Sequence, residues 1–549
     1  MGAWTDDLID QCFRTRAGIE PGRVAIVDPP NRPDLTDGDP LELTWAGFDT
    51  MIWQLAAVLY DEGIRAGDVV AVQLPNTVEI AATFLAVVRL GGIVCPFPVQ
   101  YRTHEIESLS ALAGATHLVT MTRIGHRPAA SEALKVVAGS SMLKTVLAFG
   151  DATPEPAVGL DRRLPSAELR EVEGYVESLE PDPNDCVTIC WTSGTESTPK
   201  GVPRAHCDWL AMSTSTIEGP ALTPDDVLLN PFPMVNMAGI NGMFLPWLQV
   251  GGVLVQHHPF DLPTFLRQIS ERRATYTVAP PALLTQLLHR EDLLAATDIS
   301  SLRSIGSGST PLAPSLLQDW HDRHGIDIIN FYGSNEGIAL LGLPQDIPDP
   351  GERAQFFPRY GVPGRKWSFR MANWTHTRIV DVDTGREITE PGVPGELRIK
   401  GPSVFAGYLP SSRVPDPFDS DGFLKTGDML EIAGDQGQYL QYVDRIKDIV
   451  VRGGAKISAA EVENLIAGHP AVGEVAIVAY PDEILGERAC AVVVPRSGQE
   501  ITLDDVVGYL RSLDVATYKL PERLLVLDAM PRNPVGKVLK RELRGLLEA

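Results

Sequence analysis

Apolar and polar residues follow two different patterns along this chain, and each pattern predicts a different kind of structure. Between residues 187 and 333, short apolar runs alternate with longer amphipathic stretches. The clearest cycle has a strand at 252–256, a helical stretch, a strand at 276–279 and a helix that opens with Pro280 and Pro281. Proline suits the first turn of a helix. Such cycles predict βα units around a largely parallel sheet.

The second pattern begins near residue 346, where short predicted strands and frequent turns replace the longer cycles. Residues 346–443 are typical of an antiparallel barrel or small sheet. The remaining chain has its own helix and strand cycle and the size of a small domain. The predicted fold class is α/β: a large N-terminal domain over residues 1–443, with a β-rich subdomain at about 346–443, and a small α+β domain at 448–549.

The most apolar window, residues 80–99, is interrupted by Arg89, Gly91, Gly92 and Pro96. A membrane-spanning helix needs about 20 largely unbroken apolar residues, so this window predicts a buried helix followed by a strand. The N-terminal residues include acids where a secretory signal has a basic start. The 6 scattered cysteines show no CxxC pair, which favours a reduced, cytoplasmic protein without a zinc site.

The charge balance excludes one class of partner. The chain has 47 basic and 71 acidic residues, a formal net charge of −24. This charge repels nucleic acid backbones and anionic lipid at long range. A small anionic nucleotide can still bind, because backbone amides, lysines and a metal ion act locally.

The strongest local signal for chemistry is a hydroxyl-rich loop that follows the predicted strand at 187–191. Its hydroxyls, glycine and lysine suit a polyphosphate that must be held without hydrolysis. It is not a Walker loop, because the required spacing is absent, and on its own it could be an ordinary polar turn. The segment reads Thr192-Ser193-Gly194-Thr195-Glu196-Ser197-Thr198-Pro199-Lys200-Gly201.

Further segments follow this loop in a fixed order: NFYGSNEG at 330–337, TGD at 426–428, DRIKDIVVRGG at 444–454 and NPVGK at 533–537. Together they resemble the superfamily of acyl-CoA synthetases, adenylation domains and firefly luciferase, and look most like stand-alone acid:CoA ligases. The resemblance implies an AMP-forming acid–thiol ligase, with a setting such as fatty acid metabolism. Its co-substrates would be ATP and coenzyme A, with Mg²⁺.

The resemblance also implies a role for each motif residue. Lys537, Glu336 and Thr195 would be catalytic, Glu336 would bind Mg²⁺, and Lys447 would be the hinge within 444–447. Gly453 and Gly454 would face the entering thiol. Nucleotide binding would fall to Thr192, Ser193, Gly194, Thr195, Thr198, Lys200, Tyr332, Gly333, Asp428, Arg445 and Lys537.

Taken singly, these residues have ordinary structural explanations. Tyr332 could be a core aromatic residue, Glu336 an acid at a helix start, and Asp428 a turn residue. Lys447 could be a solvated lysine. The chain also departs from the common pattern at Glu196-Ser197 and at Asn335, where relatives often have Thr-Gly and Thr.

By position, the acid pocket would be lined by Asn236, Met237, Gly239, Asn241, Gly306, Ser307, Gly308 and Ser309. The small residues are expected to leave room, and Met237 puts a soft apolar side chain where dihydroxybenzoate-activating relatives have an amide. An amino acid substrate would need a carboxylate to hold its ammonium, and this set supplies none. The predicted substrate is an apolar monocarboxylate: medium-chain, alicyclic or aromatic.

Two alternatives remain open. The enzyme could load a carrier protein instead of coenzyme A, because the adenylation chemistry is shared. It could also be an inactive nucleotide-binding homologue, for which Glu196 is the only hint. The sequence does not reveal the acid, the pathway, or whether the chain forms a homodimer.

Overall fold

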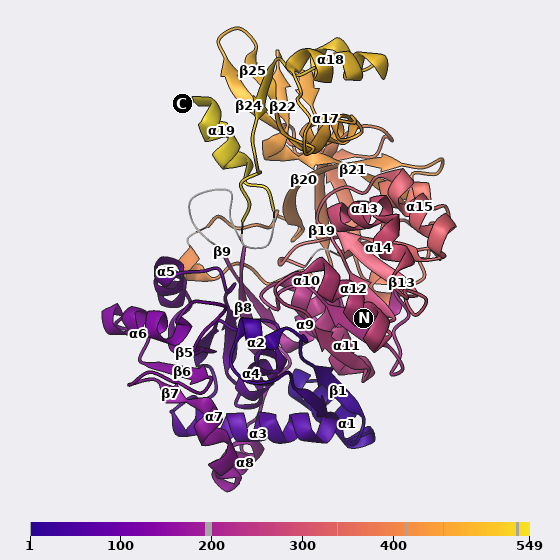
Figure 1. Ribbon diagram of the computed structural model, residues 1–549. Coiled ribbons are helices and arrows are strands. Elements are labelled where there is room, and N and C mark those ends of the chain that lie inside the picture. The colour runs from indigo at the N-terminus through magenta and orange to yellow at the C-terminus, as the bar shows by residue number, and fades with distance from the viewer. Residues whose placement is uncertain are drawn as a thin grey trace. The chain divides into compact units, whose positions relative to one another are not determined.

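The computed structural model describes residues 2–192, 200–337, 339–412, 414–453, 455–533 and 537–548. The chain divides into two compact units (Figure 1). The first comprises Met1–Ala354, Pro363–His376 and Lys400–Pro417, and the second comprises Gln355–Val362, Thr377–Ile399 and Phe418–Ala549. The strands of the β-rich segment therefore group with the C-terminal segment. The hinge predicted at 444–447 stays a prediction, because a hinge is defined by a movement between two conformations.

The first unit contains a seven-stranded sheet that carries the hydroxyl-rich loop. Most of its neighbouring strands are parallel, and β8 and β9 form an antiparallel pair at one edge. In spatial order the strands are β7 (Val158–Gly159), β6 (Thr145–Phe149), β5 (Ala115–Met121), β3 (Val69–Val72), β4 (Ile93–Pro96), β8 (Cys186–Thr192) and β9 (Lys200–Ala205).

An eight-stranded sheet in the same unit confirms the predicted βα cycles. Its central strands are parallel, and an antiparallel strand lies at each edge. In spatial order they are β15 (Ala339–Gly342), β14 (Asp327–Gly333), β13 (Ser304–Gly308), β12 (Tyr276–Val278), β10 (Val227–Asn230), β11 (Val253–Gln256), β1 (Val24–Val27) and β2 (Glu42–Thr44).

Helices of the first unit cover these sheets. The π-helical turn Ile240–Phe244 separates the short α10 from α11. The helices are α1 (Ile9–Ile19), α2 (Arg32–Leu35), α3 (Trp45–Asp61), α4 (Val78–Arg89), α5 (Thr103–Ala113), α6 (Ala129–Gly139), α7 (Leu160–Arg163), α8 (Leu169–Glu177), α9 (His206–Glu218), α10 (Met237–Gly239), α11 (Leu245–Val250), α12 (Leu262–Arg272), α13 (Pro281–His289), α14 (Glu291–Ala295), α15 (Pro314–His324) and α16 (Pro350–Gln355).

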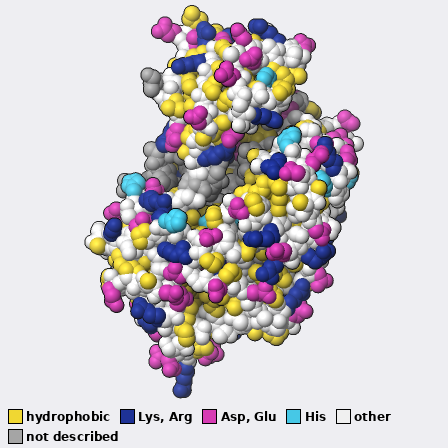
Figure 2. Space-filling model, in the orientation of Figure 1, with side chains coloured by type: hydrophobic (Ala, Val, Ile, Leu, Met, Phe, Trp, Pro, Cys, Tyr) yellow, Lys and Arg dark blue, Asp and Glu magenta, His cyan; other side chains and the backbone are white. Residues whose placement is uncertain are grey.

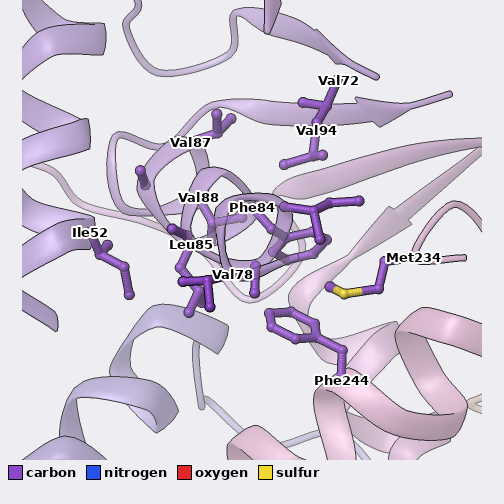
Figure 3. Packing of buried hydrophobic residues seen from close by; sticks show 14 of the residues in the cluster. Ile52, Val72, Val78, Phe84, Leu85, Val87, Val88, Val94, Met234 and Phe244 are labelled. Atoms are coloured by element: carbon purple, nitrogen blue, oxygen red, sulfur yellow. The ribbon is translucent and has the colours of Figure 1, made fainter. Parts of the chain in front are cut away.

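The apolar window at 80–99 forms α4 and β4, as predicted. Every residue of α4 is buried, which explains its uniform hydrophobicity without a membrane. Figure 3 shows its side chains, among them Phe84, gathered with Val94 of β4 and Phe244 of the π-helical turn. Across the described residues, no helix has the length and apolar character that a membrane crossing requires.

The second unit contains two sheets. The six-stranded sheet has the spatial order β16 (Phe356–Pro358), β21 (Tyr439–Arg445), β20 (Leu424–Ala433), β19 (Gly395–Lys400), β17 (His376–Val380) and β18 (Glu387–Ile388). The other sheet contains β23 (Ala455–Ile457), β22 (Val450–Arg452), β25 (Gly486–Pro495), β24 (Val472–Asp482) and β26 (Arg523–Val526). It is accompanied by α17 (Ala459–Ala467), α18 (Leu503–Ser512) and α19 (Lys540–Glu548).

The fold class is therefore the predicted one, with parallel sheets in the large N-terminal part and a smaller mixed C-terminal part. Figure 2 shows acidic and basic side chains scattered over the visible face among apolar ones.

Candidate active site

The β8–β9 hairpin forms the base of the predicted phosphate loop. Thr192, the last residue of β8, pairs directly with Lys200, the first residue of β9. The two described ends of the loop are thus adjacent. The predicted phosphate-binding residues Ser193, Gly194, Thr195 and Thr198, together with Glu196, lie outside the described residues, and their roles stay predictions.

Glu336 follows β14 and is held by a neighbouring segment of the first unit. The Tyr408 hydroxyl donates to its Oε1 at 2.8 Å, and the Phe405 amide donates to its carbonyl at 3.0 Å. Lys200 Nζ lies 5.2 Å from the centroid of the Tyr408 ring, within range of a cation–π contact. Tyr408 thus links the lysine of the phosphate loop to the carboxylate predicted to bind Mg²⁺.

Tyr408 remains a hydrogen-bond donor across the physiological range. Burial raises the pKa of its phenol most, and the charge and hydrogen bond of Glu336 raise it further. Sequence reasoning missed this residue, because a lone tyrosine in a turn carries no signal. Only the fold brings it to Glu336, which lies 72 residues earlier in the chain.

Asn335, noted above as a departure from the usual threonine, connects three segments. Its side-chain Oδ1 accepts from the Met237 amide at 2.9 Å, and its Nδ2 donates to the Trp191 carbonyl at 3.4 Å. Trp191 precedes the phosphate loop, and Met237 opens the predicted acid-binding segment. One amide therefore joins both predicted substrate regions to the Glu336 loop.

Arg204 braces the same loop from β9. This residue is 1% exposed, and its guanidinium donates to the Asn335 carbonyl at 2.8 and 3.0 Å and to the Ser403 carbonyl at 2.9 Å. Burial lowers its pKa, while the charges of Asp208 and Glu336 act against that effect. A buried cation bonded to carbonyls fixes the backbone beside Glu336.

Two residues predicted to bind the nucleotide, Tyr332 and Gly333, lie at the end of β14. Tyr332 pairs with Leu340 of β15 and is half-buried, and Gly333 is exposed. Adenine stacking on Tyr332 stays a prediction.

The predicted acid-pocket residues come from two elements of the first unit. Asn236 caps α10, because its Oδ1 accepts from the Ala238 amide at 3.0 Å, and Ser307 donates to the Ala279 carbonyl at 2.8 Å. These two polar groups are therefore satisfied by the protein. Met237 is half-buried and Asn241 is buried, whereas Ser309 is exposed with a positive φ of 73°.

The glycines of this set are explained by close packing. A side chain at Gly306 would overlap the Phe331 ring, one at Gly308 would overlap the Phe331 carbonyl, and one at Gly239 would overlap the Pro233 carbonyl. The expectation that small residues leave room for the acid stays a prediction. At Gly306 the neighbouring side chains are Phe331, Tyr276 and Val278, all in close contact with the glycine.

In the second unit, the other predicted nucleotide residues gather around one charge cluster. Asp428 of β20 is paired in register with Arg445 of β21, and Arg445 Nε lies 3.2 Å from Asp428 Oδ1. Part of Lys537 is solvent-exposed, but burial lowers the pKa of its ammonium to about 8, with the positive charges of Arg445 and Lys447 contributing. Asp428 acts in the opposite direction.

The backbone of Lys537 is fixed by Asn533. The Lys537 amide donates to Asn533 Oδ1 at 2.8 Å, and the Asn533 amide donates to the Lys537 carbonyl at 2.8 Å. Three residues further on, Lys540 forms an ion pair with Glu463 at 2.7 Å, which anchors the start of α19. These contacts fix the Lys537 backbone against Asn533 and the helix that follows against Glu463.

The predicted hinge residue lies in a short 3₁₀ turn, Ile446–Asp448, next to the charge cluster. Arg544 of α19 donates to the Lys447 carbonyl at 3.2 Å and to Asp448 Oδ1 at 2.8 Å. Burial and Arg445 lower the pKa of Lys447 to about 8. The turn is thus held by the C-terminal helix.

On the predicted thiol side, Gly453 has a positive φ of 57°, and its amide donates to the Leu485 carbonyl at 2.7 Å. Its neighbour Gly454 lies outside the described residues.

Two segments of the chain match known protein families. Residues 13–409 match the AMP-binding enzyme family, and residues 461–537 match the AMP-binding enzyme C-terminal domain. The chain belongs to the AMP-binding enzyme family. This confirms the resemblance predicted from the motifs and supports the predicted enzyme class, an AMP-forming acyl-CoA synthetase.

Individual relatives extend over nearly the whole chain. Indoleacetate–CoA ligase of Aromatoleum aromaticum is 31% identical over 97% of this chain and 96% of its own length. Pyochelin synthase PchD of Pseudomonas aeruginosa is also 31% identical, over 100% of this chain and 93% of its own. The crystal structure of ATP-bound MatB from Rhodopseudomonas palustris is similar with a TM-score of 0.77 and 25% identity, covering 99% of both chains.

Proposed function

We propose that the protein is an ATP-dependent acid:CoA ligase that activates an apolar monocarboxylate. In the first half-reaction, a carboxylate oxygen of the acid bonds to the α-phosphorus of ATP, and pyrophosphate leaves. In the second, the thiolate of coenzyme A bonds to the acyl carbon, and AMP leaves. Family membership and the relative named as an indoleacetate–CoA ligase support this reaction and an acid with a ring.

The observation that carries the proposal is the charge cluster around Lys537. The first half-reaction brings a carboxylate to a triphosphate, so charge neutralisation and positioning provide most of the catalysis. Lys537 would place its ammonium between the carboxylate oxygen and the α-phosphate, while Asp428 accepts hydrogen bonds from the ribose hydroxyls. The ion pair between Asp428 and Arg445 and the hydrogen bond from the Lys537 amide to Asn533 support these roles.

Residues of the first unit would bind the phosphates and Mg²⁺. The described part of the chain contains no group of three acidic, histidine or cysteine side chains that could hold a metal alone. A single carboxylate nevertheless fits Mg²⁺, which is usually bound by one or two carboxylates together with substrate phosphates. Bound Mg²⁺ would neutralise phosphate charge. Glu336, oriented by Tyr408, would supply the protein ligand, and Lys200 would contact the phosphates.

A panel of acids tests the proposal. With Mg-ATP and a suitable apolar acid, the purified protein is expected to exchange labelled pyrophosphate into ATP, and AMP release should then depend on coenzyme A. ATP binding without exchange on a broad panel would establish the inactive homologue instead. Exchange that coenzyme A does not follow with AMP release would favour a carrier protein as acceptor, the alternative kept open by a relative that is not named as a CoA ligase.

The rate of adenylate formation is expected to fall at alkaline pH. The cation is the useful form of Lys537, and its pKa is lowered to about 8. As pH rises through this value the ammonium becomes neutral, so kcat/KM for Mg-ATP in the exchange reaction should decrease above about pH 8.

Lys537→Arg separates this effect from the titration of neighbouring Lys447, whose pKa is also about 8. Arginine keeps its charge at all these pH values. The alkaline decrease should therefore disappear in Lys537→Arg, and its persistence would assign it to another group.

A further inference from the structure

Tyr276, the first residue of β12, has a polar group that the protein does not satisfy. The residue is 0% exposed, and within the described part of the chain its hydroxyl has no hydrogen-bond partner. Buried tyrosine hydroxyls usually find a partner, because leaving one unpaired costs its full desolvation. An unpaired hydroxyl in a native core therefore needs an explanation.

The hydroxyl lies beside the proposed acid pocket. Val278 of β12 is paired in register with Gly306 of β13. A Cβ atom built on Gly306 would lie 2.8 Å from the Tyr276 hydroxyl and would overlap the Phe331 ring. Phe331 is half-buried, so its ring forms an apolar wall next to the unpaired hydroxyl.

A second unpaired polar atom belongs to a residue of the predicted acid pocket. Asn241 is 2% exposed, and its side-chain Oδ1 has no partner among the described residues. It lies in the π-helical turn Ile240–Phe244, an element that often marks functional sites. Ile240 and Phe244 of this turn belong to the same buried cluster as Tyr276 and Val278. Asn241 thus belongs to the predicted acid pocket, and Tyr276 lies next to another of its residues, Gly306.

From these observations we infer that Tyr276 and Asn241 recognise a hydrogen-bond donor on the acid. An amide oxygen only accepts hydrogen bonds, and a phenol oxygen can accept while its own proton stays available. Their partner would be a ring N–H, an amino group or a hydroxyl on an otherwise apolar aromatic or alicyclic acid. This inference rests on the proposed function and narrows its substrate class.

Matched acid pairs test the inference. We would compare indole-3-acetate with its benzothiophene analogue, and 4-hydroxyphenylacetate with phenylacetate, by kcat/KM in pyrophosphate exchange. The wild-type protein is expected to prefer the donor-bearing acid of at least one pair by about tenfold or more. Tyr276→Phe should lower kcat/KM for that acid alone and remove the preference.

Tyr175→Phe is the matched control. The Tyr175 hydroxyl accepts from the Ala66 amide at 2.8 Å and donates to the Leu90 carbonyl at 3.3 Å, so its loss breaks existing bonds. This variant should keep the acid preference and unfold at a lower temperature. Tyr276→Phe, in contrast, should be at least as stable as wild type without acid, because it removes an unpaired group.

The possible failures are distinguishable. Active exchange without any preference in wild type, or an equal loss on both acids in Tyr276→Phe, would overturn the inference and leave the proposed function intact. A destabilised acid-free Tyr276→Phe would show that the hydroxyl already has a partner, such as a buried water, and would overturn the inference. If no acid supports exchange, the proposed function fails; calorimetric binding of the same acid pairs then decides, and equal affinities overturn the inference.

Discussion

Lys537→Ala is expected to lower the rate of pyrophosphate exchange by about 100- to 1000-fold, the usual cost of removing one preorganised charge from a transition state. Its affinity for Mg-ATP should change by no more than about threefold, because the ammonium acts mainly where the carboxylate and α-phosphate crowd together. Exchange kinetics and calorimetric titration with Mg-ATP measure the two quantities separately.

Two other variants are to be compared with Lys537→Ala. Lys540→Ala removes a lysine of the same segment that pairs with Glu463, and it should affect exchange far less. Asp428→Ala should weaken ATP binding first, because the proposed contacts to the ribose would be lost. Equal losses of binding and exchange in Lys537→Ala would contradict a role confined to the reacting groups.

Lys447→Pro is expected to leave adenylate formation largely intact and to lower thioester formation from added acyl adenylate by about 100-fold or more. The resemblance implies that one small domain serves both half-reactions by turning about this residue. Hinges are short joints that absorb changes in φ and ψ. Proline fixes φ and removes an N–H, so it should block the turn. The two half-reactions are measured separately.

Lys447→Ala controls for the side chain, because it removes the ammonium but leaves the backbone its freedom. It should retain most of the thioester step. The 3₁₀ turn already exists in the structure and is held by Arg544, so the first half-reaction should tolerate the proline. An unchanged thioester step in Lys447→Pro would mean that the chain needs no rotation here.

Local sequence signals predicted much of the fold. The cycle from β11 to α13 was predictable because short apolar strands alternate with amphipathic stretches and Pro280 and Pro281 mark the helix start. α4 was predictable as a buried helix because glycines and a proline limit its apolar window. Such patterns depend on neighbours in the chain.

The contacts that hold the site were not predictable, because they join distant segments. Arg204 reaches Ser403, 199 residues later, and nothing in its local sequence marks it as a brace. Asn335 stood out only as a departure from a pattern, and its partners Met237 and Trp191 are fixed by tertiary structure. The grouping of β16 with the C-terminal part likewise depends on long-range pairing, with β21.

The amide of Asn335 has a consequence for protein engineering. The Asn335 side chain bonds to both Met237 and Trp191. A library that randomises residues 236–241 to admit a new acid would therefore also disturb Trp191, which precedes the predicted phosphate loop. Variants selected only for fit to the new acid would then lose turnover with ATP. A productive library would keep Asn335 and the Met237 backbone and vary Phe331 and Tyr276, which lie beside Gly306 of the proposed acid pocket and, among the described residues, do not contact this amide.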